Sequence, residues 1–114
     1  MKATPRVGAA VRGSTSGRPI MVVFDLLGRR GAMRILWELR DQPLNFRQLL
    51  EAAQTNPALL NTRLAELREV ALVAHEAGGY RLTADGSALL LAMQPINEWA
   101  ERWGRRSRAR AQAR

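Results

Sequence analysis

The stretch that decides the fold is residues 43–83, PLNFRQLLEAAQTNPALLNTRLAELREVALVAHEAGGYRLT. It predicts a helix, a short turn, a second helix and then a tight two-stranded hairpin. That order of elements is the outline of a winged helix-turn-helix. The second helix opens with small polar residues and carries an apolar stripe on one side only. A helix of this kind can pack into a core and still present its front end to a DNA groove.

Both helices begin with recognisable start signals. Asn45 is predicted to cap the first one, with Gln48 three residues later as in a capping box, and this helix ends near Ala53. After the turn 54–55, Asn56 caps the second helix and Pro57 occupies its first position.

The second helix has one face that must be buried. Leu60, Leu64 and Leu67 recur at the spacing i, i+4, i+7, and Ala71 continues the stripe. At 100° per residue, this stripe fixes the opposite, outward face. The outward positions are Ala58, Thr62, Ala65 and Glu69, with Asn61 on the flank.

The front half of that outward face carries side chains short enough to approach base edges. Asn61 can make a bidentate pair with adenine, whereas Ala58 and the methyl group of Thr62 can contact a thymine methyl. The alternative is an ordinary amphipathic helix with a small polar face. The capped helix before it and the Gly-Gly hairpin after it favour DNA binding.

Several arginines have two interpretations. Arg63 reaches a phosphate or pairs with Glu66 or Glu69, and Arg81 is either a wing contact to DNA or a solvated strand residue. At the start of the helix expected over residues 32–41, three arginines either contact phosphate or pair with Asp25 and Glu38. These three are Arg29, Arg30 and Arg34.

Further helices flank this centre. A helix is expected from Pro19 to Gly28, and its apolar positions are Ile20, Val23, Phe24 and Leu27. Thr83 is a plausible cap for a last helical region that runs to Trp103, with Pro95 as a kink or break. Trp99 and Trp103 lie on one face, together with Ile96. They belong either to the core or to a dimer interface.

The net charge of +8 is concentrated in the tails. Residues 19–103 hold nine basic residues and all ten acidic ones, so the middle of the chain is near neutral. We therefore expect a flexible basic arm over residues 1–17, one domain over 18–103 and a disordered Arg-rich tail over 104–114. The tails either aid solubility or grip phosphates without reading sequence.

Composition argues against several other classes. The chain has no Cys and a single His75, which leaves little for a metal site, a cofactor or His-based catalysis. No nucleophile elbow, metal-ligand spacing or phosphate loop is present, so we expect no catalytic residues, no bound metal and no enzyme activity. No apolar run approaches a membrane span, and we expect a cytoplasmic protein without a membrane partner.

The pattern as a whole resembles the HxlR-type helix-turn-helix transcriptional regulators over about residues 18–103. The resemblance rests on Asp25-Leu26-Leu27-Gly28, Ile35-Leu36-x-Glu38-Leu39, Phe46-x-x-Leu49, Leu60-x-x-Arg63-Leu64-x-Glu66-Leu67, Leu72-Val73, Tyr80-x-Leu82-Thr83-x-x-Gly86 and Trp99. It implies a winged-helix homodimer on a pseudo-palindromic operator, mainly α with a small β-hairpin (α+β). The expected parts are a three-helix core with N- and C-terminal dimerisation helices.

The resemblance also implies roles for individual residues. DNA-binding roles carry over to Asn56, Ala58, Asn61, Thr62, Arg63 and Arg30, and dimer contacts to Ile20, Val23, Phe24, Leu27, Ile96, Trp99 and Trp103. Three departures stand out. Arg18 replaces the Cys that some members use to sense oxidants, Gly31 replaces a usual Trp, and the wing is shorter than usual.

The sequence therefore predicts a dimeric regulator whose partners are double-stranded DNA and a second copy of itself. It leaves room for a small-molecule effector of unknown identity. The alternative is a winged-helix protein-interaction module, or a protein that coats DNA non-specifically through its basic tails.

Overall fold

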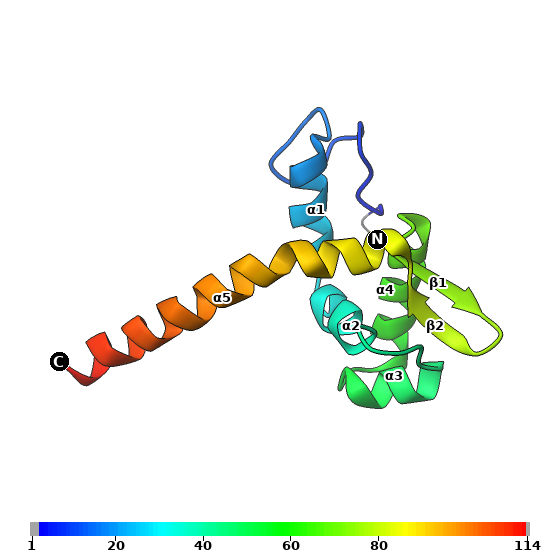
Figure 1. Cartoon of the computed structure of the whole chain (residues 1–114). Coiled ribbons are helices and arrows are strands. Elements are labelled where there is room, and N and C mark those ends of the chain that lie inside the picture. The colour runs from blue at the N-terminus through cyan, green and yellow to red at the C-terminus, as the bar shows by residue number, and fades with distance from the viewer. Residues whose placement is uncertain (1–2, 114) are drawn as a thin grey trace.

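The computed structural model describes residues 3–113, which form five helices and one antiparallel hairpin (Figure 1). This arrangement confirms the prediction of a mainly α fold with a small β-hairpin. The elements are α1 (Pro19–Leu27), α2 (Ala32–Glu38), α3 (Phe46–Ala52), α4 (Pro57–Glu69), β1 (Val73–Glu76), β2 (Gly79–Leu82) and α5 (Ala84–Gln112).

The core lies where α2, α3 and α4 meet the hairpin. Its largest fully buried side chains are Ile35, Leu36, Leu49, Leu60 and Leu67. Leu60, Leu64 and Leu67 are thus buried as predicted, which leaves the opposite side of α4 to solvent. Ala71 does not continue this stripe, because α4 ends at Glu69 and Ala71 is exposed in a left-handed conformation with φ +61°.

The predicted helix caps are confirmed. The Asn45 side chain accepts from the backbone N–H of Gln48 at 2.8 Å, and the Gln48 side chain accepts from the N–H of Asn45 at 2.9 Å. Asn56 accepts from the N–H of Leu59 at 2.9 Å, and Thr83 from the N–H of Gly86 at 3.1 Å. These bonds satisfy N–H groups that a helix start otherwise leaves unpaired.

The first two helices follow the sequence closely, with one correction. Helix α1 begins at Pro19 and is capped by Gly28, as predicted. Helix α2 ends at Glu38 rather than near Asp41, because Leu39 leaves the helical conformation, with φ −91° and ψ 3°. The cap before α2 is Gly31 at φ +85°, a conformation that a β-carbon disfavours.

The hairpin pairs Val73 with Leu82 and Glu76 with Gly79. A third segment joins its edge, because Leu44 and Tyr80 exchange backbone hydrogen bonds of 3.0 and 2.8 Å. Gly79 has φ +132°, and a β-carbon there would lie 2.5 Å from the carbonyl oxygen of Leu44. Glycine at this position allows both the turn and the close approach of residue 44.

The prediction of a disordered tail over residues 104–114 is wrong for the part that the structure describes. Helix α5 continues to Gln112, and its far end extends away from the body of the molecule (Figure 1). Ala and Arg are strong helix formers and need no core to favour a helix. Pro95 lies inside α5 without ending it. None of the described helices is long and apolar enough to cross a membrane.

The N-terminal segment contains no helix or named strand between residues 3 and 17, but it contacts the domain. Gly8 donates to the carbonyl of Gly17 at 3.0 Å, and Arg29 donates to the carbonyl of Ala3 at 2.6 Å. The segment that was predicted as a flexible arm is therefore folded back onto α1 and the loop between α1 and α2. Lys2 and Arg114, two of the basic residues counted in the tails, lie outside the described residues.

Candidate nucleic-acid interface

Helices α3 and α4 form the predicted helix-turn-helix. The turn between them is tight because Gln54 adopts a left-handed conformation with φ +51°. The cap at Asn56 and Pro57 at the first position of α4 then set the start of the second helix. The leucine stripe fixes the rotation of α4, so its outward face is determined by the core.

That outward face has the predicted composition. Ala58, Asn61 and Ala65 are exposed, and Thr62 is half-buried. The Thr62 hydroxyl donates to the carbonyl of Ala58 at 3.0 Å, which leaves its methyl group and its acceptor lone pairs for other contacts. The front of α4 therefore exposes short, uncharged side chains that can lie close to another surface.

Asn56 has a structural role that overlaps with its expected role in DNA binding. Its side-chain oxygen is used by the cap at Leu59. The amide NH2 group has no partner among the described residues and can still donate to a phosphate.

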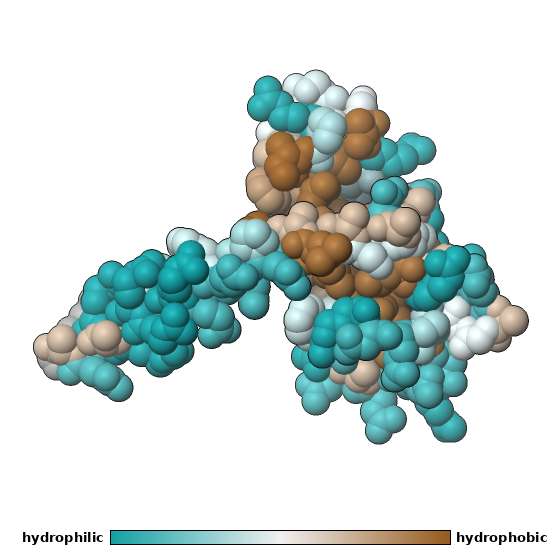
Figure 2. All heavy atoms as spheres, viewed as in Figure 1, coloured by the Kyte–Doolittle hydropathy of each residue, from teal (hydrophilic) through white to brown (hydrophobic). Residues whose placement is uncertain are grey.

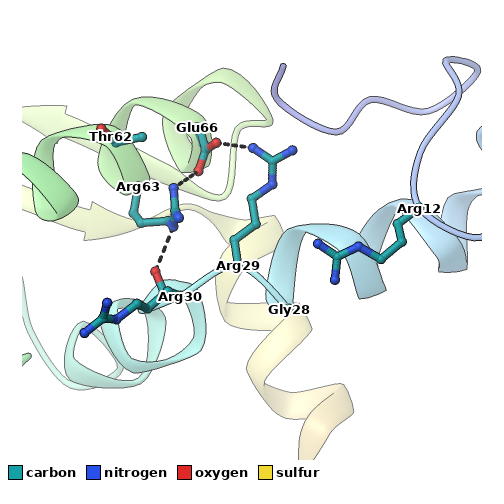
Figure 3. Close-up of a pocket in the computed structure, with 7 residues that line it drawn as sticks. All are labelled: Arg12, Gly28, Arg29, Arg30, Thr62, Arg63 and Glu66. Carbon is teal, nitrogen blue, oxygen red and sulfur yellow. Dashed lines mark hydrogen bonds and ion pairs between the residues drawn. The ribbon is translucent and has the colours of Figure 1, made fainter. Parts of the chain in front are cut away.

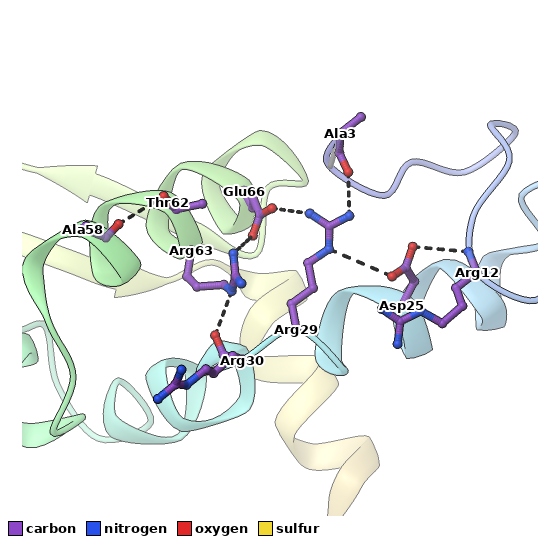
Figure 4. A network of polar contacts seen from close by, with 9 residues as sticks. All are labelled: Ala3, Arg12, Asp25, Arg29, Arg30, Ala58, Thr62, Arg63 and Glu66. Carbon is purple, nitrogen blue, oxygen red and sulfur yellow. Dashed lines mark hydrogen bonds and ion pairs between the residues drawn. The ribbon is translucent and has the colours of Figure 1, made fainter. Parts of the chain in front are cut away.

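Arg63 pairs with Glu66, which is the second of the two alternatives predicted for it (Figure 4). Its guanidinium donates to Glu66 at 2.9 Å and to the carbonyl of Arg30 at 2.7 Å, and only 15% of its side chain is exposed. Arg63 thus joins α4 to the loop before α2. The guanidinium is directed into the protein and does not extend toward a groove.

A buried ionic network underlies this contact and was not predicted. Glu66 is buried and forms an ion pair with Arg29 as well as with Arg63. Arg29 also lies 3.9 Å from Asp25, another buried carboxylate, as the sequence allowed. Only the spacing of Arg63 and Glu66 hinted at a pair, because Arg29 is 37 positions away from Glu66 in sequence.

Arg34 and Arg30, the other two arginines near the start of α2, differ in whether they form an ion pair. Arg34 pairs with Glu38 at 2.8 Å, which is one of the two alternatives that the sequence left open. Arg30 is exposed, and its guanidinium makes no ion pair with a carboxylate among residues 3–113. Of the basic residues expected near DNA, Arg30 is thus the one beside α4 whose charge is not neutralised locally.

The wing carries Arg81, which pairs with Glu76 across the hairpin. The hydrogen bond and charge of Arg81 lower the pKa of the Glu76 carboxyl, and Glu76 in turn raises the pKa of Arg81. The side chains of Arg81 and Glu76 are 42% and 60% exposed, so solvent screens this pair and Arg81 can exchange partners.

The residues expected in a dimer interface lie on α1 and α5, and among them Leu27 packs against the core. Trp99 and Trp103 stack with ring centroids 5.8 Å apart, and each is 50% exposed. Ile20, Phe24 and Ile96 are also about half exposed, whereas Val23 and Leu27 are half-buried. Figure 2 shows hydrophobic residues gathered at the surface over α1 and the first part of α5.

The comparisons with known proteins agree with this geometry. Residues 26–108 match the family model described as HxlR-like helix-turn-helix. The chain is 25% identical over 88 residues to an uncharacterised HTH-type transcriptional regulator, MJ0925, of Methanocaldococcus jannaschii, covering 73% of this chain and 83% of the relative.

Two solved structures are of YodB from B. subtilis. The quinone-bound form superposes with a TM-score of 0.70 at 31% identity, covering 73% of this chain and 96% of YodB. The reduced form gives 0.67 at 30% identity, covering 73% and 90%. With a family match that spans most of the chain and this agreement in fold, the protein belongs to the HxlR-like helix-turn-helix family of transcriptional regulators.

Proposed function

We propose that the protein is a homodimeric, sequence-specific DNA-binding regulator that acts in the cytoplasm on a pseudo-palindromic operator. The observation that carries this proposal is the face of α4, buried on its leucine side and exposing Ala58, Asn61 and Ala65 at its front. In this proposal the front half of α4 lies in the major groove, where such side chains read base edges.

Phosphate contacts come from the residues around α4. The exposed Arg30 lies next to the start of α2, and Arg81 lies on the wing. Contacts of this kind fix the register of a protein on DNA without specifying sequence. Arg63 contributes indirectly, because it holds the loop that carries Arg30 against α4.

The second copy is proposed from the unpartnered apolar surface of α1 and α5. Phe24 is 57% exposed and Ile96 is 53% exposed, and the stacked tryptophans continue this surface along α5. Two copies joined there place two α4 helices on successive major grooves, roughly 34–36 Å apart.

The test is selection of duplexes from a random-sequence pool on the purified full chain, at a salt concentration high enough to weaken non-specific binding. We expect a two-fold symmetric motif whose half-sites are one helical turn apart. A folded sample that enriches no motif contradicts the proposal.

A second candidate is non-specific DNA binding driven by basic segments. It is favoured by the far end of α5, where Arg102, Arg105, Arg106, Arg108 and Arg110 follow the last acid, Glu101. Binding of that kind is steep in salt and indifferent to sequence, so the same selection separates the two candidates.

A further inference from the structure

A pocket of about 400 Å³ lies between α4, the loop before α2 and the N-terminal segment (Figure 3). Its walls include four arginines, one carboxylate and one hydroxyl: Arg12, Arg29, Arg30, Arg63, Glu66 and Thr62. Three segments that are distant in sequence thus contribute basic residues to the lining of one pocket.

The charges of this pocket do not cancel. Glu66 is already held by both Arg29 and Arg63, and Asp25 accepts from the backbone N–H of Arg12 at 3.4 Å. Neither the Arg12 nor the Arg30 guanidinium pairs with a carboxylate in the part of the chain that the structure describes. An excess of positive charge therefore remains at the mouth of the pocket, where both arginines are exposed.

One buried donor in the pocket wall is also unsatisfied. Only 8% of the Arg29 side chain is exposed, and its Nε has no hydrogen-bond partner among residues 3–113. The nearest carboxylate oxygen, on Asp25, is 3.9 Å away and too distant for a hydrogen bond. This Nε faces Asp25 and has almost no exposed surface, so it belongs to the ionic network behind the pocket wall and is not available to an occupant (Figure 4).

We propose that this pocket is an oxyanion site for a phosphate group. Arg12 and Arg30 provide the uncompensated charge at its mouth, and guanidinium groups match phosphate oxygens in geometry. The occupant bridges the N-terminal segment and the loop before α2. Because Arg63 ties that loop to α4, occupancy fixes the position of α4 relative to both.

The phosphate group that binds in this pocket can belong to a small phosphorylated effector or to the DNA backbone. The binding step is tested first without DNA, so its failure is distinct from a failure of operator recognition. Inorganic phosphate is titrated into the full chain at constant ionic strength while the backbone amide signals of the residues around the pocket are followed by NMR.

We expect saturable shifts centred on Thr62 and the loop 28–31. Arg12→Gln and Arg30→Gln each weaken the affinity for phosphate about tenfold, as expected for loss of a charge-assisted hydrogen bond. Arg68→Gln, at an exposed arginine of α4 outside the pocket, leaves the affinity unchanged. Shifts that do not saturate, or pocket variants that titrate like the wild type, overturn the proposal.

A repeat of the titration on the duplex-saturated protein identifies the source. Loss of phosphate binding assigns the pocket to a backbone phosphate of the DNA. Retention of phosphate binding assigns it to a small phosphorylated effector that binds together with DNA.

Discussion

At the scale of single residues, the network around Glu66 has the largest consequences. Its carboxylate is buried and shared by two arginines from different segments. The sequence could not reveal this, because helical periodicity assigns faces within one helix but says nothing of contacts between helices. From the sequence alone, a buried and paired glutamate at position 66 could not be distinguished from a solvent-exposed one.

Removal of the Glu66 charge is expected to destabilise the fold. Glu66→Gln leaves two mostly buried guanidiniums without their carboxylate, which costs about 3–5 kcal/mol of unfolding free energy. Glu69→Gln, at an exposed position of the same helix, is expected to change it by less than about 0.5 kcal/mol. Urea denaturation of both variants measures this difference, and equal stabilities contradict the network.

The ion pair between Arg81 and Glu76 in the wing predicts how stability depends on pH. Because Arg81 lowers the pKa of Glu76, the pair contributes stability above the unfolded-state pKa of that carboxyl and loses it as pH falls through the lowered folded-state pKa. Arg81→Gln is expected to move the titration midpoint of Glu76 upward, as followed by the NMR signal of its carboxyl carbon. Arg68→Gln, at an exposed position of α4, is the control and should leave the Glu76 midpoint unchanged. An unchanged Glu76 midpoint would show that the pair does not form in solution.

At the scale of elements, the parts predictable from sequence are those with local chemical signals. Three helix starts were predicted correctly from their capping residues, Asn45, Asn56 and Thr83, and the hairpin turn was predicted from its glycines. The end of α5 was missed because its apolar stripe stops near Trp103, and a solvated helix needs no such stripe. Side-chain roles of the arginines were predictable only as alternatives, since the choice depends on long-range neighbours.

The hairpin allows a matched test at this scale. Gly79→Ala places a β-carbon at φ +132° and 2.5 Å from the Leu44 carbonyl oxygen, so we expect a loss of more than about 1 kcal/mol in unfolding free energy. Gly78→Ala meets no atom within 4 Å and has no positive φ, and should be nearly neutral. Thermal unfolding of the two variants compares them directly. Equal melting temperatures would contradict the close approach of residue 44 to the wing.

At the scale of the whole molecule, the domain has an apolar surface over α1 and α5 that residues 3–113 do not cover. Burial of this surface against a second copy would explain why two stacked tryptophans lie outside the core. The positive charge at the far end of α5 then extends beyond the dimer contact.

Trp99→Ala is expected to weaken dimerisation at least tenfold, because an indole at an interface buries a large apolar area. Glu101→Ala, at an exposed position two residues further along α5, is the control and should leave the association unchanged. Sedimentation velocity over a range of concentrations measures both variants. A Trp99→Ala protein that dimerises like the wild type would remove Trp99 from the interface.

The most direct test of the account is a second duplex selection on Asn61→Ala, compared with the wild type and with Gln112→Ala at the far end of α5. We expect the motif selected by Asn61→Ala to lose its preference at one base position in each half-site and to keep its symmetry and spacing, whereas Gln112→Ala selects the wild-type motif. An unchanged motif from a folded Asn61→Ala protein would contradict base reading by this face of α4.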